Sequence, residues 1–206
     1  MIPDPKELKR FTPQERANHW LVAIGFILAA LSGLTFFHPA FWPLAQLFGG
    51  GVWTRILHPF IGLLLVVLFA LQFVRFRTLN RMTDADWEWM KRIGELLSGN
   101  DRNMPAQDKF NAGEKLMFWA QSICLLLLVL SGVVMWRAYW SLPLPLVRLA
   151  AVLHAAAGAV MIGLIFGHIY AAIWTPGTIY AMVYGTVSRA WAKQHHATWY
   201  RQMTGG

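Results

Sequence analysis

Four long apolar runs dominate the hydrophobic pattern of the chain, and polar or glycine- and proline-rich segments separate them. The runs cover about residues 19–37, 56–76, 116–136 and 146–174. Because a helix needs about 20 apolar residues to cross a bilayer, each run is long enough to be a membrane span. The pattern predicts an all-α membrane protein, a bundle of four transmembrane helices that forms one integral membrane domain over residues 1–206.

The segment between the second and third runs has a helical pattern of its own. Apolar side chains recur there at Trp87, Met90, Ile93 and Leu97, with charged residues between them. This spacing predicts an amphipathic helix that lies along the membrane surface. A helix that packs against another subunit is the alternative.

The composition agrees with a membrane protein, because 56% of the residues are hydrophobic and 14% are charged. Soluble domains carry about a quarter charged residues. A net charge of +8 could indicate a nucleic-acid-binding protein. However, the basic residues flank the apolar runs and do not form one continuous basic surface. We therefore expect membrane lipid and no nucleic acid as a partner. The single cysteine excludes an intrachain disulfide and a thiolate metal site.

The basic residues are distributed unevenly among the segments between the runs. The N-terminal, middle and C-terminal segments contain 15 of the 18 Lys and Arg residues. The two other gaps contain only Arg55 and Arg137, and Arg148 lies at the start of the fourth run. By the positive-inside rule, both termini and the long middle segment are expected in the cytoplasm.

Four of the seven histidines lie in the apolar runs or at their edges, namely His19, His58, His154 and His168. An ionisable group in hydrocarbon is costly and needs a partner, but all ten Asp and Glu residues lie outside the runs. The topology places His58 and His154 near the periplasmic side, and His19 and His168 near the cytoplasmic side. His154 and His168 are fourteen residues apart in one run, so they share a helix face and are separated by about 21 Å.

Two depth-matched pairs of neutral imidazoles are what two haem irons need as axial ligands. The expected pairs are His58 with His154 and His19 with His168. Ligation by two histidines leaves no open iron position, which favours electron transfer over substrate chemistry. Zinc is a poorer candidate because it usually takes three or four protein ligands. In the alternative, the histidines form hydrogen bonds between the helices of a haem-free anchor or transporter subunit. His38, His195 and His196 lie outside this pattern, and we expect them in solvated or interfacial positions.

A short internal repeat accompanies the histidines. Gly62 and Gly158 each lie four residues after a histidine, on the same helix face, where they leave space for a flat macrocycle. The runs before these histidines contain Leu-Ser-Gly at residues 31–33 and 130–132. Small residues that mediate ordinary helix contacts are the alternative interpretation.

From Phe11 to Gln202 the chain resembles the gamma, cytochrome b subunit of membrane-bound respiratory formate dehydrogenase, of the N and O types. The stretches that carry the resemblance are ERANHW at 15–20, RILHPF at 55–60, FNAGEK at 110–115, LHAAAG at 153–158 and HIY at 168–170. The resemblance implies two haems b held by the same histidine pairs. It also implies a multi-pass protein of the bacterial inner membrane.

The resemblance further implies a site for menaquinone or ubiquinone beside the cytoplasmic haem, formed by Asn111, Gly113 and His168. From its sequence position alone, Asn111 is a helix N-cap. The implied partners are an iron–sulfur beta subunit and a molybdenum- or tungsten-containing catalytic alpha subunit, in a complex that associates further. Formate oxidation would occur in the alpha subunit, so this chain would carry electrons and reduce quinone. The related cytochrome b subunit of nickel–iron hydrogenase is the second candidate family.

Overall fold

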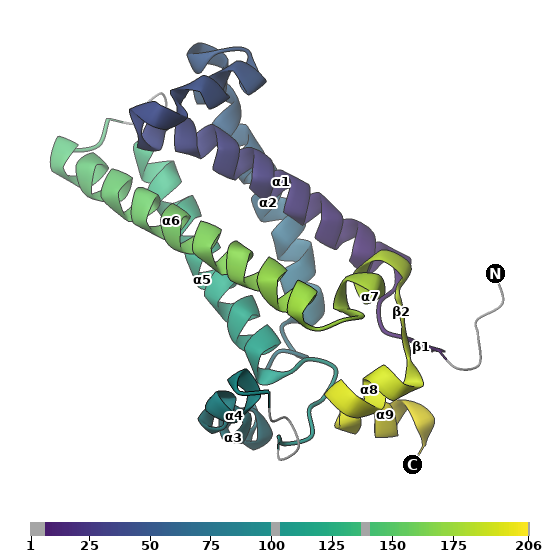
Figure 1. Cartoon of the computed structure of the whole chain (residues 1–206). Coiled ribbons are helices and arrows are strands. Elements are labelled where there is room, and N and C mark those ends of the chain that lie inside the picture. The colour runs from purple at the N-terminus through teal and green to yellow at the C-terminus, as the bar shows by residue number, and fades with distance from the viewer. Residues whose placement is uncertain (1–6, 100–103, 137–140, 206) are drawn as a thin grey trace. The chain divides into compact units, whose positions relative to one another are not determined.

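The computed structural model describes residues 7–99, 104–136 and 141–205, apart from the side chains of residues 96 and 97. Lys6, Arg102 and Arg137, which contribute to the charge pattern, lie outside this part of the chain. The described chain is mostly helical (Figure 1) and divides into two compact units. That the two units form one integral membrane domain stays a prediction.

The first unit, here called the helical unit, comprises residues 17–74 and 120–167. It contains most of four long helices: α1 (Pro13–Phe37), α2 (Gly51–Phe76), α5 (Ala112–Met135) and α6 (Leu144–Trp174). Each has 24 to 31 residues and is apolar enough to cross a membrane, which confirms the four predicted spans. Each helix begins two to six residues before its apolar run, and in α1 and α5 the first turn contains charged residues.

The outward surfaces of these helices are apolar. Ile24, Leu64, Leu126 and Phe166, one from each helix, are all more than half exposed. A soluble protein rarely exposes large contiguous apolar surface, whereas lipid-facing helices are expected to do so. The chain is therefore a multi-pass membrane protein.

The interior of the helical unit is a small apolar core. It consists of Leu65 and Phe69 from α2, Cys124 and Leu125 from α5, and Met161 from α6. Met161 is seven residues from both His154 and His168, or about 10 Å along the helix from each. Along α6, the core residue Met161 thus lies midway between the turns that carry His154 and His168.

A 3₁₀ helix, η1 (Pro39–Phe48), connects α1 to α2 and was not expected from the sequence. Its N-cap is His38, whose exposed ring accepts a hydrogen bond from the Ala40 N–H at 3.2 Å. It ends at Gly49, which has a φ of 84°. The exposed position expected for His38 is confirmed.

The second unit, here called the terminal unit, comprises the described residues within 7–16, 75–119 and 168–205. The predicted amphipathic helix is present there as two helices, α3 (Asp84–Lys91) and α4 (Ile93–Leu97), interrupted at Arg92. The C-terminal segment forms α7 (Thr178–Tyr184), α8 (Arg189–His195) and α9 (Ala197–Thr204).

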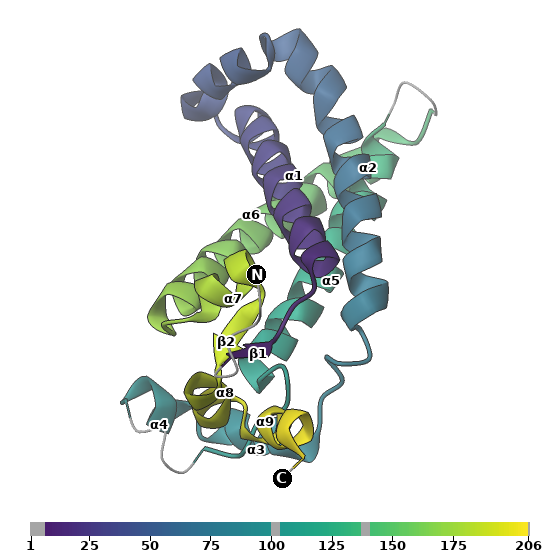
Figure 2. The same ribbon diagram turned by 90° about the vertical axis from the view of Figure 1, so that its right-hand side faces the viewer.

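A two-stranded antiparallel sheet joins the two ends of the described chain. Strand β1 (Glu7–Lys9) pairs with β2 (Thr186–Ser188), with Leu8 opposite Val187. The strands lie side by side in both Figure 1 and Figure 2. Leu8 and Val187 are both buried, so this short sheet anchors the N-terminal segment to the C-terminal segment within the terminal unit.

Candidate functional site

His58 on α2 and His154 on α6 lie next to each other in the helical unit. Their ring centroids are 6.1 Å apart, and the ring planes are at 77° to each other. An imidazole nitrogen binds a metal ion at about 2.0 Å, and the ring centre lies about 1.1 Å behind that nitrogen. Two imidazoles on opposite sides of one ion therefore have centres about 6 Å apart. The observed spacing matches this value.

Each imidazole contacts a serine on the preceding long helix, α1 for His58 and α5 for His154. The Nδ1 atom of His58 lies 2.8 Å from the Ser32 hydroxyl oxygen, and that of His154 lies 3.0 Å from the Ser131 hydroxyl oxygen. With Nδ1 engaged in each ring, Nε2 is the nitrogen that remains for a metal.

The glycines beside these contacts leave room for the rings. A Cβ atom on Gly33 would lie 3.1 Å from His58 Cε1, and one on Gly132 would lie 3.4 Å from His154 Cε1. The Leu-Ser-Gly repeat therefore supports both histidines in the same way. The contacts of the two serines were not predicted from the sequence.

Space for a flat group exists along the histidine-bearing helices. A Cβ on Gly62 would meet no heavy atom of the described residues within 4 Å, and one on Gly158 would meet only Leu128 at 3.9 Å. The donor set, its spacing and these small residues fit a haem between α2 and α6.

The other two predicted ligands lie in different units. His19 is on α1 in the helical unit, and His168 is on α6 in the terminal unit. Their pairing at one haem stays a prediction.

Asn111 caps α5 in the terminal unit. Its side-chain oxygen accepts a hydrogen bond from the Glu114 N–H at 2.9 Å, and the Glu114 carboxylate accepts one from the Asn111 N–H at 2.8 Å. This reciprocal pair is a capping box, which confirms the N-cap interpretation. It uses the side-chain oxygen of Asn111 and leaves the Nδ2 amide hydrogens for another acceptor.

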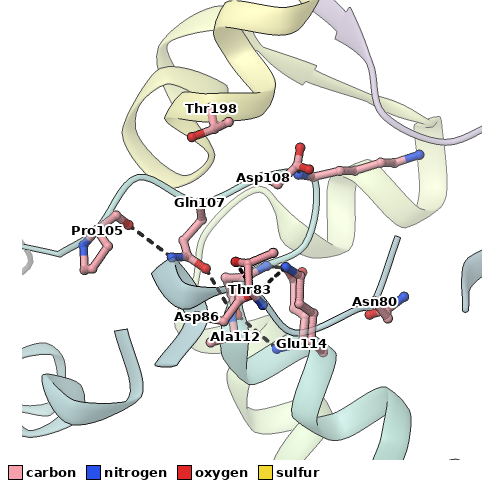
Figure 3. A network of polar contacts seen from close by, with 12 residues as sticks. Asn80, Thr83, Asp86, Pro105, Gln107, Asp108, Ala112, Glu114 and Thr198 are labelled. Atoms are coloured by element: carbon pink, nitrogen blue, oxygen red, sulfur yellow. Dashed lines mark hydrogen bonds and ion pairs between the residues drawn. The ribbon is translucent and has the colours of Figure 1, made fainter. Parts of the chain in front are cut away.

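The turn that contains Asn111 is tightly packed. A Cβ on Gly113 would lie 3.3 Å from Asn111 Oδ1 and 3.4 Å from the Trp89 ring. Gln107 holds the same turn, because its Oε1 accepts from the Ala112 N–H at 3.0 Å and its Nε2 donates to the Pro105 carbonyl at 3.2 Å (Figure 3).

Three acidic residues each accept a hydrogen bond at the N-terminus of a helix. Each also forms an ion pair with a basic residue from a distant segment of the chain. Besides Glu114, they are Glu15, which accepts from the Thr12 N–H, and Asp86, which accepts from the Thr83 N–H and hydroxyl. The ion pairs are Glu15–Arg75 at 2.8 Å, Asp86–Lys115 at 2.6 Å and Glu114–Arg10 at 3.1 Å. This network was not predicted from the sequence, although an acid three residues after Thr or Asn is the signal of a capping box.

Asp86 and Lys115 form the most buried of these pairs, with side chains 2% and 3% exposed. Burial alone would raise the pKa of Asp86, but the hydrogen bonds from Lys115 and Thr83 outweigh it and hold the pKa below its usual value. Figure 3 shows Asp86 and Thr83 close to Ala112 at the start of α5. The pair therefore joins α3 to the turn that carries Asn111.

Comparison with known proteins identifies the family. The family model for prokaryotic cytochrome b561 matches residues 10–185. The cytochrome b556(Fdn) subunit of nitrate-inducible formate dehydrogenase from Escherichia coli strain K12 is 43% identical over 191 residues, which cover 92% of this chain and 88% of that protein. The chain is a member of the prokaryotic cytochrome b561 family.

Two further relatives agree with this assignment. The formate dehydrogenase cytochrome b556(fdo) subunit of Escherichia coli strain K12 is 43% identical, over 94% of this chain and 92% of that protein. The formate dehydrogenase cytochrome b556 subunit of Haemophilus influenzae is 34% identical, over 97% of this chain and 84% of that protein. Within the cytochrome b561 family, the chain thus belongs with the cytochrome b subunits of formate dehydrogenase. A cytochrome b family implies haem b as the cofactor.

One histidine of this cytochrome b, His196, is buried although the sequence predicts an exposed position for it. His196 was expected in a solvated or interfacial position but is 2% exposed. Its Nδ1–H donates to the Asp108 carbonyl at 2.6 Å, and the rings of Trp191 and Trp199 lie 5.1 and 6.5 Å from its centroid. It is buried because α8 and α9 fold back on the segment around Asp108, a contact between positions 88 residues apart in the sequence.

Acidification should destabilise the terminal unit through His196. Burial, and then the nearby Arg10, lower the pKa of His196 from 6.5 to about 4. The unfolded chain therefore takes up this proton first, so the stability that His196 contributes is complete above about pH 6.5 and is lost as the pH falls towards 4. The full shift corresponds to about 3 kcal/mol. Unfolding of the detergent-solubilised protein, measured between pH 4 and pH 7, should show this loss.

The matched variant is His196→Gln, which retains an N–H donor and cannot be protonated. Its stability should vary less with pH than that of the wild type, whereas His195→Gln should keep the wild-type dependence. Equal pH dependence in the wild type and His196→Gln would refute the assignment.

Proposed function

We propose that this chain is the membrane subunit of a respiratory formate dehydrogenase. It anchors the complex and carries electrons from a periplasmic iron–sulfur subunit, on two haems b, to quinone at the cytoplasmic side. The observation that carries the proposal is the His58–His154 pair, with a centroid spacing of 6.1 Å. Haem b held by two imidazoles supplies one-electron redox chemistry and has no open position for a substrate.

The distribution of charge supports the direction of transfer. The terminal unit contains the N-terminal ends of α1 and α5 and the C-terminal ends of α2 and α6. Most of the Lys and Arg residues fall in the same segments. By the positive-inside rule we expect these segments to face the cytoplasm, with His58 and His154 towards the periplasm.

His19 and His168 are the proposed ligands of the second haem. The fourteen residues between His154 and His168 span about 21 Å along α6. Helix α6 would therefore contribute one ligand to each haem. The second ligand would come from α2 for the haem at His154 and from α1 for the haem at His168. The apolar core around Met161 would exclude water from the level between them.

The proposed quinone site consists of Asn111, Gly113 and His168, which all belong to the terminal unit. Asn111 has amide hydrogens to donate to a quinone carbonyl, because its cap uses only the side-chain oxygen. Gly113 keeps the turn narrow beside Trp89. Glu114, in the same turn, lies within electrostatic range of His168. Protons for quinone reduction would enter from the cytoplasm.

The relatives are named as subunits of formate dehydrogenase. The proposal therefore includes an iron–sulfur beta subunit and a molybdenum- or tungsten-containing alpha subunit as partners, in a complex that associates further. Formate oxidation is assigned to the alpha subunit. This chain would contribute the membrane anchor, the haem ligands and the quinone contacts.

The test uses the purified complex and the variant His168→Ala. Pyridine haemochromogen analysis should find two haems b in the wild-type chain and one in the variant. Formate-dependent reduction of a quinone analogue should fall at least a hundredfold in the variant. Reduction of a soluble dye that accepts electrons from the catalytic subunits should be unchanged. His195→Ala, in the tail, is the matched control and should resemble the wild type.

Two results would count against this function. A wild-type chain that is folded in a haem-supplied preparation but carries no haem b would exclude it. Normal quinone reduction by His168→Ala would remove His168 from both the cytoplasmic haem and the quinone site.

A further inference from the structure

The serine contacts to His58 and His154 share one arrangement of hydrogen-bond partners. The Ser32 hydroxyl donates to the Leu28 carbonyl at 2.7 Å and lies 3.1 Å from the Ala29 carbonyl. The Ser131 hydroxyl does the same towards the Leu127 carbonyl at 2.6 Å and the Leu128 carbonyl at 3.2 Å. Each hydroxyl has one proton, and donation of that proton to its own helix leaves the oxygen as an acceptor for the facing ring.

In this arrangement the hydroxyl oxygen accepts a hydrogen bond from the facing imidazole. The Nδ1 atoms of His58 and His154, 2.8 Å from Ser32 and 3.0 Å from Ser131, then carry the hydrogen. In a neutral imidazole this places the lone pair on Nε2, the form that binds a metal through Nε2. Ser32 is fully buried and Ser131 is 6% exposed, so water does not compete readily for either contact.

We propose that Ser32 and Ser131 are positioning residues that hold His58 and His154 as Nδ1–H tautomers, with Nε2 directed to the iron of the periplasmic haem, and thereby lower the potential of that haem. This inference rests on the proposed haem ligation. The same contact occurs twice, from α1 to α2 and from α5 to α6, each time with a glycine next to the serine and against Cε1 of the ring. Because the contact recurs at two different helix interfaces, it is associated with the two histidines and not with the packing of one particular helix pair.

The direction of the effect follows from ligand basicity. An acceptor on Nδ1–H makes the imidazole a stronger electron donor, which favours ferric over ferrous iron. Without the acceptor, the reduced state gains relative stability and the potential rises. Loss of such a partner commonly changes metal binding 10- to 100-fold. We expect the equilibrium constant for reduction to rise about tenfold in each variant, or about 59 mV for one electron.

The experiment is an equilibrium redox titration of Ser32→Ala and Ser131→Ala in the purified complex, followed by haem absorbance. The wild type should titrate in two waves, one for each haem. In each variant one wave should move to higher potential, the same wave in both, while the other stays in place. Ser32→Thr keeps a hydroxyl that can bond to the same helix carbonyl, so it should restore the wild-type position.

Thr35→Val is the matched control. Thr35 is a buried hydroxyl on α1 that donates to the Ser32 carbonyl at 2.6 Å, so its loss removes a comparable helix bond without removing a hydrogen bond to a histidine ring. Both waves should stay in place in this variant. Unshifted waves in Ser32→Ala and Ser131→Ala, or an equal shift in Thr35→Val, would overturn the inference.

Failure of the proposed function gives a different result. If the wild-type complex carried no haem b, the ligation itself would be wrong and no wave would be observed. If it carried two haems whose potentials ignore both serines, the ligation would stand and only the role of the serines would be lost.

Discussion

His58→Ala and His154→Ala should each reduce the haem content from two to one per chain. In the proposed arrangement, either substitution removes one of the two histidines that would hold the periplasmic haem and leaves the cytoplasmic pair, His19 and His168, intact. The small side chain also leaves a cavity beside Ser32 or Ser131, where the serine hydroxyl loses its hydrogen-bond partner on the ring. Pyridine haemochromogen quantitation against protein concentration is the measurement, with the visible spectrum of the remaining haem as the second readout.

The two variants should have the same haem content and spectrum, because both histidines are expected to hold the same haem. Each should retain the same residual spectrum, and His58→Ala/His154→Ala should lose no more haem than either single variant. His19→Ala should instead lose the other haem, so that His19→Ala/His58→Ala carries none. His38→Ala, at the exposed N-cap of η1, should retain both haems. Two normal haems in both His58→Ala and His154→Ala would exclude this pair as ligands.

Much of this arrangement follows from periodicity and depth. The four spans could be predicted because about 20 consecutive apolar residues have few uses other than crossing a bilayer. The proximity of His58 and His154 could be expected because both lie near the same predicted end of their helices. The structure places their rings next to each other. Their role as haem ligands stays a prediction.

The support for these rings could not be read from the sequence. The Leu-Ser-Gly repeat was visible, but the partner of each serine depends on how α1 turns towards α2 and α5 towards α6. A serine within an apolar helix usually bonds to its own backbone. Ser32 and Ser131 do so and also meet a histidine. Only the packing between helices reveals the second contact.

The terminal unit was the least predictable part of the chain. Its charged residues lie in the polar segments outside the apolar runs, yet Arg10, Asp86, Lys115 and His196 are each at most 3% exposed. They are buried by contacts between segments that are far apart in the sequence, such as Arg10 with Glu114. Local propensity carries no information about such contacts. The β1–β2 pairing is also beyond prediction, because each strand has only three residues.

Lys115→Met should destabilise the terminal unit by about 3–5 kcal/mol, the usual cost of removing one partner from a buried ion pair. The Asp86 carboxylate would remain, 2% exposed, and would keep the hydrogen bonds from Thr83 but lose the positive charge of Lys115. Lys91→Ala, on the same helix as Asp86, provides the control. It removes a pair with Glu88 in which both side chains are exposed, and such a pair contributes about 0–1 kcal/mol. Unfolding of the detergent-solubilised protein measures both.

The double variant Lys115→Met/Asp86→Asn separates the charge from the shape of the site. The asparagine introduced by Asp86→Asn would still accept from the Thr83 N–H but would carry no charge, so much of the lost stability should return. If Lys115→Met were no less stable than Lys91→Ala, the buried pair would not stabilise the fold. Because Lys115 follows the 111–113 turn directly on α5, we also expect Lys115→Met to weaken quinone reduction while both haems stay bound. Loss of stability together with loss of quinone reduction would show that the Asp86–Lys115 pair maintains the shape of the turn that carries Asn111 and Gly113.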